Sequence, residues 1–224
     1  MPAMVFAAGR GTRMRPLTDD RPKALVQVAG RALIDHALDQ VAGLSPVVVN
    51  AHHHADLLED HLAGRDVRVS REAVLLETGG GLRAARALLG PGPVMTINAD
   101  MAWTGPRAAD TLRAAWDPAR MDGLLLLVGL ERRAEPGRWA FAMDADGRLS
   151  RADNGLDYAG AGILRADALD RIEGPVFSLR EAWPPMMDAG RLFGVIHPGG
   201  WADVGRPEAI APAEAMLAAA EARA

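Results

Sequence analysis

The sequence predicts an α/β protein in which helices cover both faces of a mostly parallel sheet, with a small α+β lobe built onto that sheet. Two observations support this fold class. Up to about residue 130, short apolar runs alternate with amphipathic stretches, as in successive strand–helix–strand units. In addition, glycines or polar side chains follow directly after several apolar runs, where an α/β sheet positions its ligands.

The predicted strands of this first half are short and apolar, and the predicted helices carry apolar residues three and four positions apart. We expect strands at residues 3–8, 47–50, 67–70, 94–98 and 124–128, and helices at residues 31–43, 55–62, 79–89 and 107–116. Between the first strand and the first helix, residues 9–23 are rich in Gly, Arg, Pro and Asp and are expected to form a loop.

The second half has a less regular pattern. We expect strands at 139–143, 148–152, 158–164 and 192–196, and helices at 166–171, 179–189 and 207–222, with Pro212 near the start of the last helix. The chain is expected to form a single domain over residues 1–224. Its core would comprise residues 1–130 and 197–224, and residues 131–196 would form a smaller substrate lobe.

Composition excludes several classes of protein. The 224 residues include 25 basic and 29 acidic side chains, and the net charge of −4 argues against nucleic acid as the main partner. The absence of cysteine excludes disulfides, thiolate nucleophiles and cysteine-based metal sites. The N-terminus lacks the features of a secretory signal, and the longest aliphatic run, 124–128, is too short to span a membrane. We therefore expect a cytoplasmic protein with no membrane partner.

A Gly-rich loop follows the first strand, with the sequence AAGRGTRMRPLT at residues 7–18. Its glycines allow backbone N–H groups to approach phosphate oxygens, and its three arginines add positive charge. A dinucleotide fingerprint is not matched, because Met14 occupies the third glycine position and Asn50, instead of an acid, ends the second strand. The P-loop pattern is absent. An ordinary connection with solvated arginines is the alternative.

Lys23 is the only lysine in the chain, and it lies in the segment RPKAL at residues 21–25. A compact ammonium can lie between phosphate groups and stabilise charge that develops during phosphoryl transfer, where the broad planar fork of arginine does not fit. A surface lysine without function is the alternative.

Two aspartates are candidate metal ligands. Asp100 follows the strand at 94–98, and Asp203 lies in the segment WADVG at residues 201–205. Two carboxylates together with phosphate oxygens would satisfy the six-oxygen shell that Mg²⁺ prefers. Each aspartate alone also fits a structural role in a turn or at a helix start.

The segment LETGGG at residues 76–81 opens the predicted helix at 79–89. Its glycines would let a flat group such as a base lie against the backbone, and Glu77 would accept hydrogen bonds from the base edge. A tight turn before a helix is the alternative. The three histidines at 52–54 do not match a metal motif, and we expect them to form a hydrogen-bonding loop and helix start.

Taken in order, AAGRGTRMRPLT, PK, LETGGG, a strand ending in Asp100, and WADVG resemble the sugar-1-phosphate nucleotidyltransferases. The resemblance covers residues 3 to about 207, and is strongest to the short members that act in cell-wall recycling. It implies a Rossmann-like nucleotide-binding sheet and transfer of a nucleotidyl group from a nucleoside triphosphate, UTP in this group, to a sugar-1-phosphate. The sugar would bind in the smaller lobe, and Mg²⁺ would be the cofactor.

The resemblance also implies roles for individual residues. Arg13 and Lys23 would be catalytic, and Asp100 and Asp203 would hold Mg²⁺. The nucleotide would contact Ala7, Ala8, Gly9, Gly11, Thr12, Glu77 and Gly80. The sugar would lie near Asn50, Asn98 and Gly160. Apart from the resemblance, Arg138, Trp139 and Tyr158 are candidate sugar contacts by residue type alone, and packing or surface charge is the alternative for them.

Two departures from the family pattern affect the site. Ala99 replaces the glycine that commonly precedes the first metal aspartate, and Arg206 stands where many members have threonine after WxDVG. Arg206 either alters the geometry near Asp203 or adds a phosphate contact. Glu77 suits guanine at least as well as uracil by hydrogen-bond logic. A mannose-1-phosphate guanylyltransferase and a non-catalytic nucleotide-sugar sensor therefore stand as alternatives.

Overall fold

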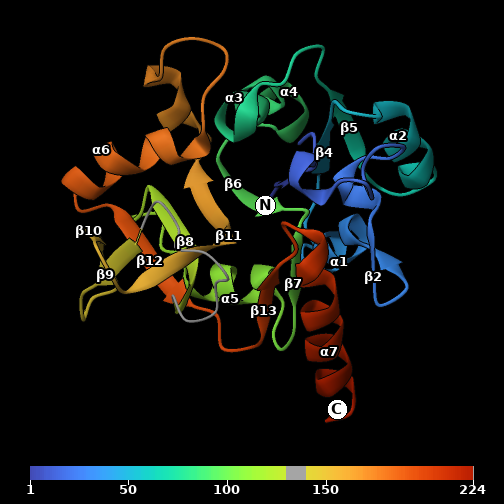
Figure 1. Ribbon diagram of the computed structural model, residues 1–224. Helices are drawn as coiled ribbons and strands as arrows, with labels where there is room; N and C mark the ends of the chain where they lie inside the picture. Colours follow the sequence, from blue (N-terminus) through green and yellow to red (C-terminus); the bar gives the residue numbers. More distant parts are fainter. Residues whose placement is uncertain (130–139, 224) are drawn as a thin grey trace.

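The structure is a computed structural model that describes residues 1–129 and 140–223 (Figure 1). The strands are β1 (Ala3–Phe6), β2 (Gln27–Val28), β3 (Arg31–Ala32), β4 (Val47–Ala51), β5 (Arg68–Arg71), β6 (Pro93–Asn98), β7 (Met101–Trp103), β8 (Gly123–Gly129), β9 (Ala140–Met143), β10 (Leu149–Ala152), β11 (Leu156–Arg165), β12 (Leu192–Ile196) and β13 (Trp201–Asp203). The α-helices are α1 (Leu33–Gln40), α2 (Ala55–Leu62), α3 (Glu77–Ala84), α4 (Arg86–Leu89), α5 (Ala108–Ala115), α6 (Trp183–Asp188) and α7 (Ile210–Glu221).

One large mixed sheet organises the molecule, and the predicted α/β fold class is confirmed. Strands β5, β4, β1 and β6 are adjacent and parallel. Strand β11 then joins antiparallel to both β6 and β8, and β12 extends the sheet parallel to β8. Strands β9 and β10 continue it beside β11. Because β11 belongs to the predicted lobe, the lobe and the core share one continuous sheet.

The two faces of the sheet are covered by different helices. Along β1, Ala3 and Val5 belong to a core cluster that includes residues of α1, α2 and α5. Met4 and Phe6 alternate with them and belong to a second cluster that includes residues of α3, α4 and α6. The two-residue period of a strand thus gives β1 two apolar faces, as a strand covered on both sides requires.

The predicted helices differ from the structure mainly at their ends. The stretch at 79–89 forms two helices, α3 and α4, and the one at 179–189 divides into the 3₁₀ helix η5 (Leu179–Ala182) followed by α6. Residues Ala166–Arg171 form a 3₁₀ helix, η4, instead of an α-helix. Pro212 lies within the first turn of α7. N–H groups in the first turn have no hydrogen-bond acceptor inside the helix, so proline is tolerated there. No helix in the described ranges has the length and apolar character needed to cross a membrane.

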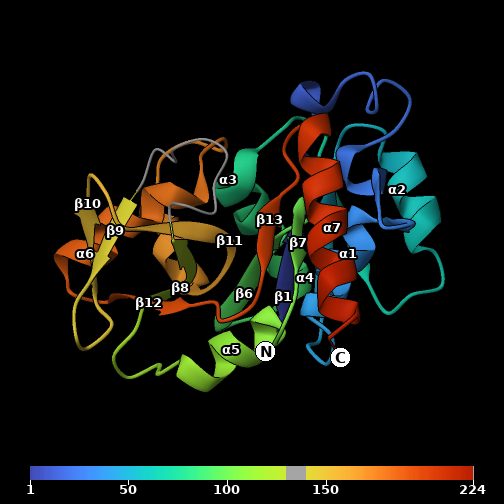
Figure 2. The same cartoon turned by 60° about the horizontal axis from the view of Figure 1, so that its bottom comes forward.

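Two short ladders are absent from the sequence-based prediction. Strands β2 and β3 form a hairpin: β2 lies between the expected loop at 9–23 and the expected helix at 31–43, and β3 replaces the start of that helix. Strands β7 and β13 pair antiparallel although about a hundred residues separate them, and both lie alongside α7 (Figure 2). Neither β7 nor β13 exceeds three residues, which is too short for periodicity to predict.

The side chain of Met14 packs the Gly-rich loop against the rest of the protein. Its side chain is fully buried in a third apolar cluster, together with Val28, Leu33, Val204 and Ala213. These residues come from the hairpin, α1, the C-terminal segment and α7. The residue that breaks the dinucleotide fingerprint is therefore a packing anchor for the loop.

We predict that Met14→Ala lowers the free energy of unfolding by about 2–5 kcal/mol, because it leaves a cavity in a closed apolar cluster. Leu17→Ala is the matched control in the same loop, since the Leu17 side chain is 40% exposed. Its expected effect is within about 0.5 kcal/mol. Urea denaturation measures both values, and equal losses for the two variants would contradict the anchoring role of Met14.

Candidate active site

The candidate site lies at the carboxyl ends of the parallel strands. In the register of the sheet, Phe6 at the end of β1 is opposite both Asn50 of β4 and Asn98 of β6. The chain leaves β1 directly into the Gly-rich loop, and the N–H of Ala7 donates a hydrogen bond to Asn50 Oδ1 at 2.7 Å. The loop therefore begins at the edge where α/β sheets bind ligands.

Asn50 and Glu72 form a buried network behind this loop. Asn50 Nδ2 donates to Glu72 Oε1 at 2.7 Å, and the N–H of Leu76 donates to Glu72 Oε2 at 3.0 Å. Both amide atoms of Asn50 are thus engaged with protein groups, and its side chain lies away from solvent. The network connects the start of the Gly-rich loop to the start of α3. Asn50 as a sugar contact stays a prediction, and the observed bonds give it a positioning role.

The Gly-rich loop is folded tightly against Lys23. Gly11 has the left-handed φ of 62°, and a Cβ atom there would lie 2.9 Å from Lys23 Cβ. Thr18 is buried and donates its hydroxyl hydrogen to the carbonyl of Gly11 at 2.9 Å. Only glycine combines this conformation with so close an approach. Within the loop, Ala7 and Ala8 are buried, whereas Gly9 and Thr12 are exposed.

Lys23 meets Asp100 across the site. Lys23 Nζ lies 2.7 Å from Asp100 Oδ2, and the two side chains are 13% and 29% exposed. An ammonium has three N–H donors, so the Asp100 bond leaves it capacity to contact phosphate oxygens. The lone lysine of the sequence is therefore part of the site and is not a surface lysine.

The β7–β13 ladder brings the second aspartate to the first. Asp203 is opposite Met101, the residue after Asp100, and the N–H of Val204 donates to the carbonyl of Asp100 at 2.9 Å. The adjacent Gly205 has little space beside it: a Cβ there would lie 3.0 Å from Asp203 Oδ1 and 3.4 Å from Arg13 Nη2. Asp100, Asp203, Lys23 and Arg13, which are widely separated in sequence, thus lie around one centre.

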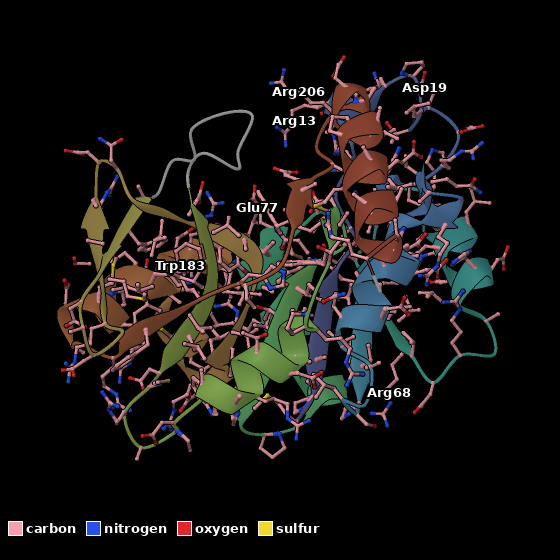
Figure 3. All side chains as sticks on the ribbon, turned by 90° about the horizontal axis from the view of Figure 1, so that it is seen from below. Arg13, Asp19, Arg68, Glu77, Trp183 and Arg206 are labelled. Atoms are coloured by element: carbon pink, nitrogen blue, oxygen red, sulfur yellow. The ribbon has the colours of Figure 1, made fainter. Side chains whose placement is uncertain are left out.

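Arginines surround this centre at the surface. Arg13 and Arg206 lie close together at one edge of the molecule, one from the Gly-rich loop and one from the C-terminal segment (Figure 3). Arg206 is exposed and follows Gly205 in an extended conformation. The departure at Arg206 therefore adds a cation beside Arg13 and leaves the Asp203 segment in a regular ladder.

The aspartate pair fits a hard divalent cation. Asp100 Oδ1 is buried and accepts no hydrogen bond among the described residues, although Lys23 occupies the other oxygen. A buried carboxylate oxygen without a donor is the type of group that a cation satisfies. Among the described residues, no group of three or more His, Cys, Asp and Glu side chains is arranged so that it could hold a metal ion. Phosphate oxygens and water would therefore complete a shell on this pair.

The glycines at the start of α3 serve chain packing. The N–H groups of Gly79 and Gly80 both donate to the carbonyl of Phe177, at 3.0 and 3.1 Å. A Cβ on Gly79 would lie 2.4 Å from the Phe177 ring, and one on Gly80 would lie 2.2 Å from the Pro175 carbonyl oxygen. The structure therefore gives a different reason for these glycines than the approach of a base. Base contacts at Gly80 and at the exposed Glu77 stay predictions.

A pocket of about 770 Å³ opens between α3 and the lobe. It is lined by Phe6, Glu77, Thr78, Asn98, Tyr158, Ser178, Leu179, Arg180, Glu181, Trp183 and Pro184. Gly160 lies beside Asn98, which lines the pocket: the φ angle of Gly160 is 89°, and a Cβ atom on it would lie 3.3 Å from Asn98 Nδ2. The predicted sugar residues Asn98, Tyr158 and Gly160 thus lie together, and the volume suits a small organic ligand.

Other site predictions have separate outcomes. Arg138 and Trp139 fall outside the described residues. The histidines form the expected loop and helix start, since His54 precedes α2 and His52 Nδ1 lies 2.9 Å from the Glu72 carbonyl. Glu72 and Arg180 lie at the site although neither was predicted. No sequence signal marks Glu72, whereas Arg180 is a basic residue three positions before the aromatic Trp183.

Comparison with known proteins decides the family. The MobA-like NTP transferase domain matches residues 3–175. A relative from Caulobacter vibrioides, N-acetylmuramate alpha-1-phosphate uridylyltransferase, is 46% identical over 97% of each chain. The chain belongs to the sugar-1-phosphate nucleotidyltransferases. A uridylyltransferase of the same name from Neisseria meningitidis is 35% identical and covers 98% of this nucleotidyltransferase.

Solved structures agree with the fold. A UDP-glucose pyrophosphorylase complexed with UDP-glucose superposes with a TM-score of 0.81 at 18% identity, covering 97% of this chain and 98% of that one. HddC from Yersinia pseudotuberculosis, complexed with GMP-PN, has a TM-score of 0.75 at 20% identity and covers 96% and 99%. The nucleotidyltransferase therefore has the sheet architecture of these proteins.

Tyr158, the only tyrosine of the nucleotidyltransferase, reports on the pocket. Burial raises its pKa from 10.0 to about 12, against the opposing effects of a hydrogen bond with Thr96 and the charge of Arg180. We predict that its phenol titrates near pH 12 in the folded protein and near pH 10 in denaturant, followed by phenolate absorbance. Stability should fall between these pH values, because the unfolded chain releases the proton first. Titration of the Tyr158 phenol near pH 10 in the folded protein would contradict its buried position. The Tyr158→Phe variant, which has no tyrosine, gives the background absorbance.

Proposed function

We propose that the nucleotidyltransferase is an N-acetylmuramate-1-phosphate uridylyltransferase that depends on Mg²⁺. It would convert UTP and N-acetylmuramate 1-phosphate into UDP-N-acetylmuramate and pyrophosphate. The observation that carries this proposal is the full-length similarity to two uridylyltransferases of that name, at 46% and 35% identity. A mannose-1-phosphate guanylyltransferase from Dictyostelium discoideum is 29% identical, and the match covers only 62% of its length.

The reaction needs no covalent nucleophile on the protein. A phosphate oxygen of the sugar-1-phosphate attacks the α-phosphorus of UTP, and the bond between the α-phosphorus and the bridging oxygen of the β-phosphate breaks. Pyrophosphate leaves with that electron pair. Catalysis of such a transfer consists mostly of positioning and charge stabilisation. This fits a site that holds cations and carboxylates and has no cysteine.

The charged residues divide this task by their positions. Lys23 lies between the Gly-rich loop and Asp100, so we assign it to the α-phosphate and the attacking sugar phosphate. Arg13 lies at the outer edge beside Gly205, so we assign it to the leaving pyrophosphate. Asp100 and Asp203 would hold Mg²⁺, which when bound neutralises phosphate charge and orients the oxygens.

The nucleotide would lie on the Gly-rich loop. The backbone of Ala7, Ala8, Gly9, Gly11 and Thr12 forms this loop at the end of β1, and bonds to Asn50 and Thr18 hold it in place. Glu77 and Gly80 at the start of α3 would flank the base. The choice of uracil rests on the two relatives.

A role in cell-wall recycling follows from the proposed substrate, whose acidic amino sugar is a cell-wall component. Zero cysteines among 224 residues is consistent with the proposed cytoplasmic location.

A substrate panel tests the proposed function. Purified full-length protein with Mg²⁺ would be assayed for pyrophosphate release with each of five nucleoside triphosphates and four sugar-1-phosphates. The nucleotides are UTP, GTP, dTTP, CTP and ATP, and the sugars are N-acetylmuramate, N-acetylglucosamine, glucose and mannose 1-phosphate. We expect release with UTP and N-acetylmuramate 1-phosphate. An optimum with GTP and mannose 1-phosphate would replace this function with the guanylyltransferase, and binding without release from any pair would favour a sensor.

We further predict that Lys23→Ala lowers kcat by about 100-fold or more, because it removes a preorganised cation from the centre of charge transfer. Lys23→Arg should fail to restore the rate, since the longer, planar guanidinium does not reproduce a largely buried ammonium whose Nζ lies 2.7 Å from Asp100 Oδ2. Arg113→Ala on the exposed face of α5 is the control and should turn over normally. Wild-type turnover by a folded Lys23→Ala protein would refute the assigned role.

A further inference from the structure

The pocket beside the active site contains a cation that the phosphate chemistry does not use. Arg180 is the only Lys or Arg among the described residues that line it. N-acetylmuramate differs from N-acetylglucosamine by a lactic acid ether on oxygen 3, and this ether carries a carboxylate. We propose that Arg180 binds the lactyl carboxylate of N-acetylmuramate 1-phosphate and selects this sugar over neutral ones. This inference rests on the proposed function.

The pocket extends from the reaction centre to Arg180. Asn98 lines it two residues before Asp100, and Gly160 lies against the same asparagine. Tyr158 and Arg180 line the same pocket as Asn98. A sugar with its 1-phosphate at Lys23 and Asp100 would therefore extend into the pocket. Its substituent on oxygen 3, remote from carbon 1, would point toward Arg180.

Arg180 is held on a rigid wall. Its guanidinium lies 5.8 Å from the centre of the Trp183 ring. That ring is only 2% exposed and packs edge-on against Tyr158 and Phe141, with ring centres 5.0 and 5.8 Å apart. A cation stacked on a fixed ring loses little freedom when a ligand binds. A planar guanidinium also matches a carboxylate with two parallel hydrogen bonds.

Glu181, the acidic residue next to Arg180, forms a hydrogen bond within its own helix. Glu181 and Ser178 form a capping box at the start of η5: Glu181 Oε1 accepts from the Ser178 N–H at 3.1 Å, and Ser178 Oγ accepts from the Arg180 N–H at 3.3 Å. The same turn is tied to α3, because the N–H of Leu179 donates to Thr78 Oγ1 at 2.9 Å. These bonds orient the Glu181 carboxylate toward the backbone and fix the place of Arg180 in the wall.

The test compares two sugars that differ in the carboxylate. Steady-state kinetics with full-length protein, Mg²⁺ and UTP would give kcat/KM for N-acetylmuramate 1-phosphate and for N-acetylglucosamine 1-phosphate. For Arg180→Gln we expect a loss of roughly 10- to 100-fold with N-acetylmuramate 1-phosphate, mainly through the KM of the sugar phosphate. The values for N-acetylglucosamine 1-phosphate and the KM for UTP should stay unchanged. Arg180→Lys should recover part of the loss, and Arg171→Gln, on the exposed end of η4, should lose nothing.

A change on the substrate provides a second measurement that does not depend on the folding of a variant. The methyl ester of the lactyl group removes the negative charge, and the wild-type protein should use this ester about as poorly as Arg180→Gln uses the acid. Equal losses with both sugars, a raised KM for UTP, or unchanged selectivity in Arg180→Gln would overturn the inference and leave the proposed function intact. If the wild-type protein does not turn over N-acetylmuramate 1-phosphate, the proposed function fails and the inference fails with it.

Discussion

The antiparallel pairing of β7 with β13 is the constraint on which the active site depends. It joins two three-residue strands from distant parts of the chain through a short ladder and the bond from Val204 to the carbonyl of Asp100. Without it, Asp203 and Gly205 would have no fixed position relative to Asp100, Lys23 and Arg13. The cluster formed by Met14, Val204 and Ala213 supports the same region from below, so apolar packing and backbone hydrogen bonds hold the acidic pair together.

The charges of the site are graded from its centre to its rim. At the centre, the compact ammonium of Lys23 contacts the Asp100 carboxylate at 2.7 Å, and the Lys23 side chain is only 13% exposed. At the rim, Arg13 and Arg206 are exposed and project from different segments. The single lysine of a chain that otherwise uses arginine for positive charge lies at this largely buried position. This distribution suits a polyphosphate whose reacting end is enclosed and whose leaving end faces solvent.

The glycines of α3 let the segment before η5 pack against this helix, next to the pocket. Because Gly79 and Gly80 lack side chains, the segment from Pro175 to Phe177 packs against the helix and accepts two of its N–H groups. This contact brings η5, and with it Arg180 and Trp183, to the pocket that Asn98 also lines. The Asn50–Glu72 network holds the residue just before α3, because Glu72 accepts a hydrogen bond from the N–H of Leu76. The Gly-rich loop and the pocket are therefore positioned by one set of neighbouring contacts.

The sequence by itself determined the α/β class and most strands of the main sheet, and it indicated Arg13, Lys23, Asp100 and Asp203 as candidates. These conclusions depend on local patterns, because apolar periodicity and glycine-rich turns are encoded within a few adjacent residues. Tertiary structure decided the β7–β13 ladder, the antiparallel entry of β11, the buried Asn50–Glu72 network and the position of Arg180. Each of these joins segments that are not adjacent in the chain, and their pairing depends on packing over the whole fold, which no local pattern contains.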